Sequence, residues 1–324
     1  MIKIISKEIR KKVKGKKKKI GFCETEDKRI IEASRYLKDN DLVEPVLIGK
    51  DIEGKKELFG IDISDLEKHN TSDEKYIKEF SELRNVSFDV SKEKMKDATY
   101  YATMLLHDSE IDGLVSGADH STEHTLRPAL KIIKGKDYFD GFVSSFFIME
   151  KEDQVYFMSD CAMNPNPSES QLSNIALQTA KSASLFIDKP RVAMLSFSTN
   201  SSSNHHMAKK VKNALNMTIK RNKDFKINAE FDGEMQLDCA ISEKVAKKKY
   251  PESNIAGNAN VLIFPDLNSG NIGYKLVERF ANFKAVGPIL QGLNKPANDL
   301  SRGAKVDDII DVACITAFQC EELK

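Results

Sequence analysis

The stretch KIGFCETEDKRIIEASRYLKDNDLVEPVLI, residues 19–48, has the pattern of a strand, a helix and a second strand. Lys19-Ile-Gly-Phe-Cys23 and Glu44-Pro-Val-Leu-Ile48 are short apolar runs, and the residues from Asp27 to Leu37 have helical spacing. Similar apolar runs recur at residues 111–115, 191–197 and 260–264. A strand buried on both faces loses the apolar/polar alternation of a half-exposed one, so the repetition predicts an α/β protein with mostly parallel sheets covered by helices on both faces.

The length of 324 residues exceeds that of a usual single core and predicts two domains. The sequence changes character near residues 138–150, which we take as the first boundary. At the C-terminal end, Val306, Ile309, Ile310, Ala313 and Ala317 have helical spacing and need a core to pack against. We therefore predict a first domain of residues 1–143 plus 302–324 and a second domain of residues 144–301. Within the second, Ser168 and Gln171 form a capping-box pattern that predicts a helix from Ser168 to Ile187.

Composition excludes several classes of partner. The net charge of +1, from 50 basic and 49 acidic residues, provides no general field for nucleic acid or an anionic membrane. The lysine-rich run at residues 11–19 has no interleaved aromatic residues and is interpreted as a solvated face. Five scattered cysteines without a Cys-x-x-Cys pair suit a reducing cytoplasm. No apolar run approaches ~20 residues, so we expect a soluble cytoplasmic protein.

Polar segments follow several of the predicted strands, where α/β proteins bind ligands. None has the glycine pattern of a Walker loop or a dinucleotide-binding loop. Arginine suits phosphate because its planar group forms two parallel hydrogen bonds. Arg302 is the strongest candidate, since Ser301 and Asn298 lie beside it. The segments are residues 24–29, 116–128, 198–204 and 265–271, and the other candidate arginines are Arg29, Arg84 and Arg127.

Residues 287–303, GPILQGLNKPANDLSRG, crowd turn-forming residues, amides, a hydroxyl group and two cations together. Two prolines and three glycines exclude a continuous helix or central strand, and predict a shaped loop suited to anion binding. Asp308 follows on a flank of the predicted last helix. It could face a cleft, and the neighbouring Asp307 could be an ordinary solvated carboxylate or a partner of the helix dipole.

Three other groups invite a catalytic interpretation that the sequence does not favour. His120 and His124 have the spacing of helical metal ligands, but no third ligand is evident, so hydrogen-bonded histidines are favoured over a zinc site. The serine-rich residues 198–203 lack a nucleophile elbow and are interpreted as a cap and turn. Cys161 has no basic neighbour to lower its pKa.

Several long motifs together resemble the phosphate acetyl/butyryltransferase family, and its phosphate acetyltransferases (phosphotransacetylases) in particular. The resemblance implies two α/β/α domains around a cleft, as in isocitrate and isopropylmalate dehydrogenases, usually in a homodimer. It implies reversible acetyl transfer between coenzyme A and phosphate, without a metal or redox cofactor, coenzyme A being a substrate. The matching motifs are GPxxQGLxKPxNDLSRG (287–303), SGAxHSTxxTLRPA (116–129), ETEDxR (24–29), ELR (82–84), DCAMNPNP (160–167), LSFST (195–199), FDGEMQ (231–236) and IFPDLNSGN (263–271).

The same resemblance implies roles for individual residues. Asp308 would be the general base for the thiol of coenzyme A, and Ser301 and Arg302 would stabilise the developing oxyanion and the phosphate. Anion binding would fall to Arg84 and Arg127, and contact with the coenzyme A end to Arg29. Two departures from the family pattern, at residues 199–206 and 85–90, leave the first loop's conformation and the affinity for coenzyme A open. Transfer of propionyl or butyryl groups, and a non-catalytic coenzyme A or acyl phosphate sensor, are the alternatives.

Overall fold

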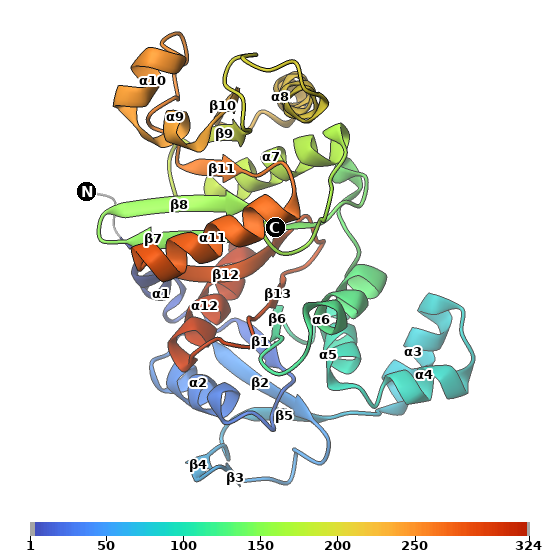
Figure 1. The fold of residues 1–324 in the computed structure, drawn as a ribbon. Helices are drawn as coiled ribbons and strands as arrows, with labels where there is room; N and C mark the ends of the chain where they lie inside the picture. Colours follow the sequence, from blue (N-terminus) through green and yellow to red (C-terminus); the bar gives the residue numbers. More distant parts are fainter. Residues whose placement is uncertain (1–3, 323–324) are drawn as a thin grey trace. The chain divides into compact units, whose positions relative to one another are not determined.

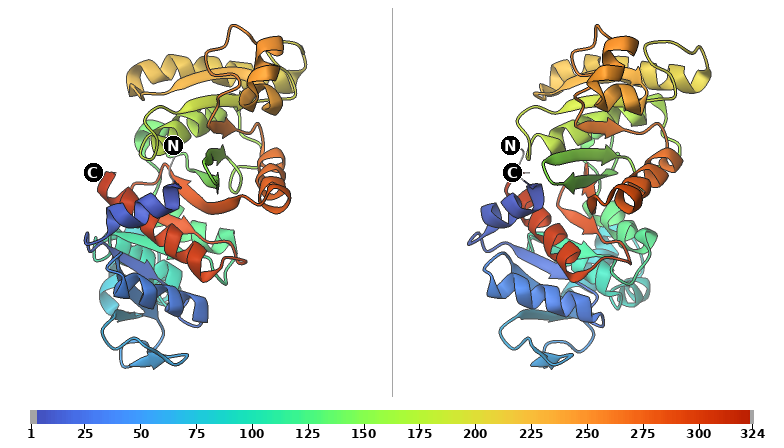
Figure 2. Two further views of the ribbon diagram at one scale, coloured as in Figure 1. Left: turned by 90° about the vertical axis from the view of Figure 1, so that its left-hand side faces the viewer. Right: turned by 60° about the vertical axis from the view of Figure 1, so that its left-hand side comes forward.

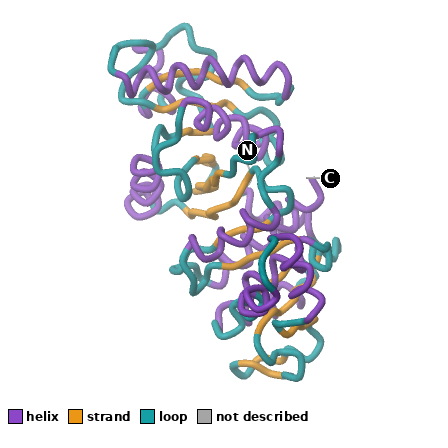
Figure 3. The backbone as a smooth tube through the Cα atoms, turned by 90° about the vertical axis from the view of Figure 1, so that its right-hand side faces the viewer, coloured by secondary structure: helices purple, strands orange, loops and turns teal. Residues whose placement is uncertain are grey.

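The computed structural model describes residues 4–322 and divides into two compact units (Figure 1). One consists mainly of residues 137–292, and the other comprises residues 6–136 together with the segment from residue 293 onward. We call them the inserted unit and the outer unit. Both alternate strands with helices, as the tube in Figure 3 shows, which confirms the predicted α/β class.

The outer unit is built on a five-stranded parallel sheet in the order β13-β6-β1-β2-β5. Helices α1, α2 and α12 pack together on one face, where α12 contacts α2, β1 and β6 (Figure 2), and α5 packs on β6, β1 and β2 from the other. The elements are α1 (Ile5–Val13), β1 (Lys19–Phe22), α2 (Lys28–Asp39), β2 (Glu44–Gly49), the hairpin β3 (Glu57–Leu58) and β4 (Ile61–Asp62), β5 (Glu67–Asn70), α3 (Glu74–Arg84), α4 (Phe88–Lys94), α5 (Ala98–His107), β6 (Gly113–Ser116), α6 (Thr122–Pro128) with a π-helical turn (Ala129–Ile133), β13 (Ala297–Asp299) and α12 (Val306–Glu322).

The inserted unit has a six-stranded mixed sheet in the order β10-β9-β11-β8-β7-β12. The pairs among β10, β9, β11 and β8 are parallel, whereas β7 pairs antiparallel with both β8 and β12. The elements are a 3₁₀ turn (Asp137–Phe139), β7 (Ser144–Lys151), β8 (Gln154–Ser159), α7 (Glu169–Ala183), β9 (Arg191–Leu195), α8 (His206–Phe225), β10 (Glu230–Met235), α9 (Leu237–Ile241), α10 (Glu243–Lys249), β11 (Val261–Ile263), α11 (Leu267–Ala281) and β12 (Lys284–Gln291).

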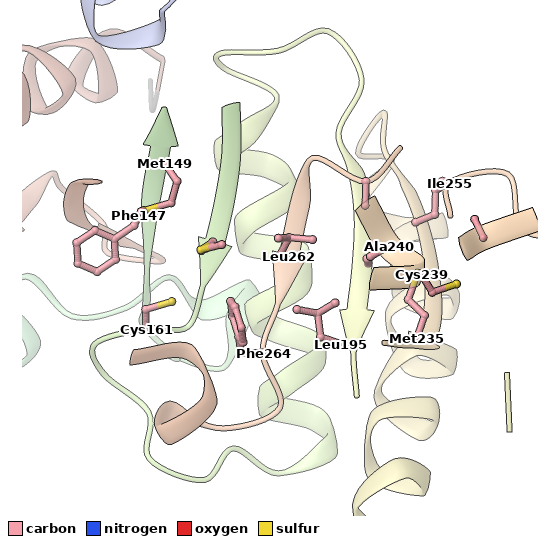
Figure 4. Packing of buried hydrophobic residues seen from close by; sticks show 14 residues of the cluster. Phe147, Met149, Cys161, Leu195, Met235, Cys239, Ala240, Ile255, Leu262 and Phe264 are labelled. Atoms are coloured by element: carbon pink, nitrogen blue, oxygen red, sulfur yellow. The ribbon is translucent and has the colours of Figure 1, made fainter. Parts of the chain in front are cut away.

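One face of this mixed sheet carries a continuous apolar cluster. Phe147, Cys161 and Leu262 belong to it, and Figure 4 shows its side chains spread across the strands toward Met235 and Cys239. Tyr274 of α11 stacks on Phe147 with ring centroids 4.1 Å apart. The residues of the cluster are almost fully buried, and the partly buried Tyr274 packs against them, so the cluster holds α9, α10 and α11 against the strands.

The elements predicted from apolar runs are confirmed. Each predicted strand overlaps an observed one, from β1 to β11, because an apolar run suits a strand buried on both faces. The predicted capping box is also present: Ser168 Oγ accepts the amide hydrogen of Gln171, whose side chain accepts that of Ser168.

Residues 287–303 are more ordered than the predicted loop. Residues up to Gln291 complete β12, and Ala297–Asp299 form β13. Both strands lie at a sheet edge, and Pro288 falls within a register shift between Val286 and Ile289. Proline is tolerated at such places because it need not donate to a neighbouring strand, so the exclusion of a central strand holds but the expectation of a continuous loop is wrong.

The contacts also divide the chain at positions other than the predicted boundaries of 143/144 and 301/302. Apart from a change after residue 5, the changes of unit fall after residues 136 and 292. Residues 293–301 lie in the outer unit because β13 pairs with β6, with Ala297 opposite Leu114 and Asp299 opposite Ser116.

Candidate active site

The predicted functional segments of the outer unit meet at the carboxyl edge of its sheet. Neighbouring strands β13, β6 and β1 are parallel, so the connections that leave them emerge at the same edge. These connections are residues 23–27, 117–121 and 300–305. Ser301 and Arg302 lie on the third, directly before α12, and both are exposed.

Glu24 organises the connection between β6 and α6. Its buried carboxylate accepts hydrogen bonds from four consecutive backbone N–H groups, those of Gly117, Ala118, Asp119 and His120, at 2.9 to 3.2 Å. It also contacts Nδ1 of His120 at 2.8 Å. Such an array of amides is a typical anion site. Here the protein's own carboxylate fills it, so Glu24 holds the loop in shape and leaves anion binding to other groups.

Arg29 joins three connections of the site. Its Nε and Nη2 donate to the carboxylate of Asp27, the residue that caps α2, and Nη2 also donates to the carbonyl oxygen of Ala118 at 2.8 Å. Its Nη1 donates to the carbonyl oxygens of Arg302 at 2.9 Å and Ala304 at 2.6 Å. Asp27 raises the pKa of Arg29, and Arg29 in turn lowers the pKa of Asp27. The N–H groups of this side chain are thus engaged within the protein.

The start of α12 carries the predicted base. Asp308 is half-buried, and its Oδ2 accepts the backbone N–H of Lys305 at 2.9 Å. Asp307 points elsewhere: it is 60% exposed and pairs with Arg10 at 2.6 Å, as does the buried Asp311. The structure therefore gives the two adjacent aspartates different surroundings.

Arg84 and Arg127 lie around Tyr100 of α5. Arg84, at the end of α3, donates to the carbonyl oxygen of Lys131 at 3.1 Å, and Arg127 of α6 pairs with Glu123. Burial raises the pKa of Tyr100, and the two arginines act in the opposite direction, so both guanidinium groups lie within electrostatic range of the phenol. A cavity of about 210 Å³ opens here, lined by Lys94, Asp97, Tyr100, Ser121, Glu123, His124 and Arg127.

Both histidines of residues 116–128 contact acidic side chains, and the His120 ring is hydrogen-bonded, as favoured from sequence. Their rings stack with centroids 4.5 Å apart. His120 contacts Glu24, and Nε2 of His124 lies 3.0 Å from Asp97, the residue that caps α5. Across residues 4–322, no three or more histidine, cysteine or acidic side chains gather as a metal site would require.

The other discounted candidates lie in the inserted unit and have structural surroundings. The buried Glu234 accepts hydrogen bonds from Ser198 Oγ and the Ser201 amide, both at 2.8 Å, and so holds the serine-rich loop. Cys161 is fully buried, and burial together with Asp160 raises its pKa. A thiol in this state is a poor nucleophile.

The structure thus collects the predicted residues of the outer unit into two groups. Ser301, Arg302 and Asp308 share the connection between β13 and α12, where Arg29 holds the backbone. Arg127 lines the Tyr100 cavity, and Arg84 lies within electrostatic range of Tyr100. Sequence reasoning overlooked the organising role of Glu24. Its position directly behind a buried strand was the available signal, but the amides it binds lie more than ninety residues away.

The fold is that of an α/β protein whose candidate site lies at the carboxyl edge of a parallel sheet. The model of the family described as phosphate acetyl/butaryl transferase matches residues 4–317. A phosphate acetyltransferase of Clostridium acetobutylicum is 45% identical over 95% of this chain and 96% of its own length. One of Thermoanaerobacterium thermosaccharolyticum is 42% identical over 98% and 99%.

Solved structures give the same result. A phosphotransacetylase of Streptococcus pyogenes has a TM-score of 0.91 at 40% identity, and one of Staphylococcus aureus a TM-score of 0.89 at 40% identity; each comparison covers 98% of both chains. This chain belongs to the phosphate acetyl/butaryl transferase family. No helix within residues 4–322 is long and apolar enough to span a membrane.

Proposed function

We propose that the protein is a phosphate acetyltransferase, which transfers an acetyl group reversibly between coenzyme A and inorganic phosphate. The observation that carries the proposal is the arrangement of the turn between β13 and α12. There Ser301 and Arg302 are exposed on a backbone held by Arg29, and the carboxylate of Asp308 lies a few residues on, at the first turn of α12. The names of the similar proteins described above agree with it.

The turn can supply the parts of a direct acyl transfer. Asp308 would take the proton of the coenzyme A thiol, whose pKa of about 8.5 leaves it mostly protonated at neutral pH. The thiolate sulfur would bond to the carbonyl carbon of acetyl phosphate, the bond from that carbon to the bridging oxygen would break, and phosphate would leave with the electron pair. The hydroxyl group of Ser301 and the guanidinium group of Arg302 are suited to stabilise the negative charge that develops on oxygen.

The arginines would bind the anionic parts of the substrates. Arg127 lines the Tyr100 cavity together with Lys94, whose Nζ lies 5.2 Å from the Tyr100 ring centre, and Arg84 lies within electrostatic range of Tyr100. The N–H groups of Arg29 already bind Asp27 and backbone carbonyl oxygens. Arg29 would therefore act on the coenzyme A end through its positive charge. The chemistry needs no metal or redox cofactor.

We further propose a homodimer in the cytoplasm. Ile272, Leu276 and Phe280 lie four residues apart along α11 and are 58%, 48% and 81% exposed. An exposed apolar stripe on a helix is typical of an interface between subunits. The cytoplasm is supported by five free cysteines, all of them buried, which have no need of an oxidising compartment.

The test is formation of the acetyl-CoA thioester from acetyl phosphate and coenzyme A, followed by its ultraviolet absorbance. We expect thioester to form in proportion to enzyme, and faster from acetyl phosphate than from propionyl or butyryl phosphate. A folded protein that binds coenzyme A without forming any thioester would overturn the proposal in favour of a sensor. If butyryl phosphate were turned over fastest, the proposed preference for acetyl groups would be wrong, and only the broader proposal of an acyltransferase would stand.

A further inference from the structure

Asp299 is a buried carboxylate within the candidate active site to which the mechanism above assigns no part. It is the last residue of β13, two positions before Ser301, and only 1% of its surface is exposed. Within residues 4–322, neither of its carboxylate oxygens has a hydrogen-bond partner. An unpaired carboxylate in the interior is costly, so its presence needs an explanation.

The structure packs Asp299 between the two connections that form the site. Gly117 has a φ of +106°, and a β-carbon at this glycine would collide with Oδ1 of Asp299 and with the backbone nitrogen of Leu300. That nitrogen donates to the carbonyl oxygen of Ser116 at 2.8 Å. The carboxylate therefore occupies the space in which the connection after β6 passes the connection after β13.

Hydroxyl groups of α6 surround this carboxylate. Burial, with a smaller contribution from Glu24, raises the pKa of Asp299 to about 6, although Thr122, Thr125 and the Leu300 amide act to lower it. The hydroxyl oxygen of Thr125 is itself buried without a partner among the described residues. A donor on α6 and an acceptor on β13, two elements that pack together, are thus both buried and unpaired.

We propose that Asp299 is a positioning residue for acyl transfer: its ionised carboxylate binds the hydroxyl groups of Thr122 and Thr125 and so fixes α6 against β13. Because α6 carries Arg127 and β13 leads into Ser301 and Arg302, this contact sets the distance between the two groups of substrate-binding residues in the outer unit. Small displacements of such groups reduce turnover strongly. The inference rests on the proposed function.

Charge, and not packing alone, is what this role requires. The protonated acid is tolerated in the interior without partners, but the ionised form draws the threonine hydroxyl groups toward it. Charged side chains on the elements that meet at this contact are Glu24, on the connection after β1, and Glu123, His124 and Arg127, on α6 itself. Among them only Glu24 is buried, and its carboxylate is held by four backbone amides.

The test compares Asp299→Asn and Thr125→Val with a control, Asp160→Asn. Asp160 is also buried, but it accepts hydrogen bonds from Ser145 Oγ at 2.5 Å and from the amide of Ala162 at 3.1 Å. At pH 7.5 we expect D299N to match or exceed the wild type in melting temperature and to lose at least tenfold in kcat, with the KM for coenzyme A within twofold. D160N should melt at a lower temperature.

Two further measurements separate positioning from a purely structural role. The stability advantage of D299N should disappear at pH 5, where Asp299 is protonated in the native wild type, and its kcat should lose the acid limb near pH 6. The double variant D299N/T125V should lose no more kcat than D299N alone. Unchanged kcat in D299N, or a variant less stable than the wild type at both pH values, would overturn the role of Asp299. A wild-type protein without activity would overturn the proposed function, and with it this inference.

Discussion

Arg29 donates a hydrogen bond from Nη1 to the backbone carbonyl oxygen of Arg302 at 2.9 Å, across 273 residues of sequence. The contact ties the connection after β1 to the turn that presents Ser301 and Arg302. A guanidinium group is suited to this because its donors point outward in one plane and can serve several acceptors at once. The turn is thus held by a side chain from the other end of the unit.

Replacement of Arg29 by lysine should loosen that turn. The single ammonium group of a lysine can bind only some of the carbonyl oxygens that Arg29 binds. We therefore expect kcat to fall roughly 10- to 100-fold and the free energy of unfolding to fall by about 1.5–3 kcal/mol. Arg35→Lys on the same helix is the matched control, since Arg35 forms exposed ion pairs with Asp39 and Asp65. Equal effects of the two variants in kinetics and urea denaturation would contradict the holding role of Arg29.

Asp308→Asn should depress turnover while leaving the fold intact. Loss of a general base reduces rates about 10²- to 10⁴-fold, and asparagine can still accept the Lys305 amide hydrogen. Coenzyme A affinity, measured by calorimetry, should change little. The neighbouring Asp307→Asn tests specificity: Arg10 keeps its contact with Asp311, so kcat should stay near that of the wild type. A D308N protein that loses affinity and turnover equally would exclude Asp308 as the base.

Glu24→Gln should destabilise the outer unit. The carboxylate accepts four amide hydrogens, whereas a glutamine offers one acceptor oxygen and places an NH₂ group among N–H donors. Each buried donor left unpaired costs about 1–3 kcal/mol, so the free energy of unfolding in urea should fall by at least that amount. Glu26→Gln, at an exposed position two residues on, should fall within about 0.5 kcal/mol of the wild type. Equal stabilities would contradict this account.

The cysteines should be unreactive in the native protein. All five are buried. Burial raises the pKa of Cys314 and Cys320 to about 12 and that of Cys23 well above its usual range, so the thiolate fraction at pH 8 is small. Ellman's reagent should therefore show no rapid phase with native protein and five equivalents in denaturant. A fast-reacting thiol at pH 8 would show that one of these sites opens.

The stripe on α11 should carry the proposed dimer contact. Phe280→Glu or Leu276→Glu would place a charge in an apolar interface, so sedimentation velocity should show a shift from dimer to monomer with an unchanged circular dichroism spectrum. Ile219→Glu, at another exposed apolar position on α8, should leave the sedimentation coefficient unchanged. A monomeric wild type, or a dimer that survives both α11 variants, would exclude this surface as the interface.

Apolar runs predicted the central strands β1, β2, β6, β9 and β11, because those strands are buried on both faces, but not the central strands β7 and β8. The edge strands gave no such signal: β5 has the sequence Glu67-Lys-His-Asn70, and β12 and β13 lie among prolines and glycines. Their pairing depends on distant partners, such as Ser116 for Asp299, which no local pattern encodes. The placement of residues 293–301 in the outer unit follows from that same pairing.

The residues of the candidate site also fall into two groups, those that a local sequence pattern predicts and those that depend on tertiary structure. Ser301, Arg302 and Asp308 could be named from a motif because they are close together in the chain. The roles of Glu24 and Asp299 depend on burial, which arises only when the connections after β1, β6 and β13 meet at one edge of the sheet. The engagement of Arg29 by Ala118, Arg302 and Ala304 is likewise a product of tertiary structure.

The position of β13 also bears on how the protein is made. During synthesis the ribosome releases residues 6–136 first, then the whole inserted unit, and only afterwards the strand that covers the free edge of β6 and the helix that packs on α2. The inserted unit can therefore fold while residues 6–136, which were translated earlier, still expose an unpaired strand edge and an apolar face. The part of the polypeptide that is translated first completes its folding last, and until then it is the part most in need of a chaperone.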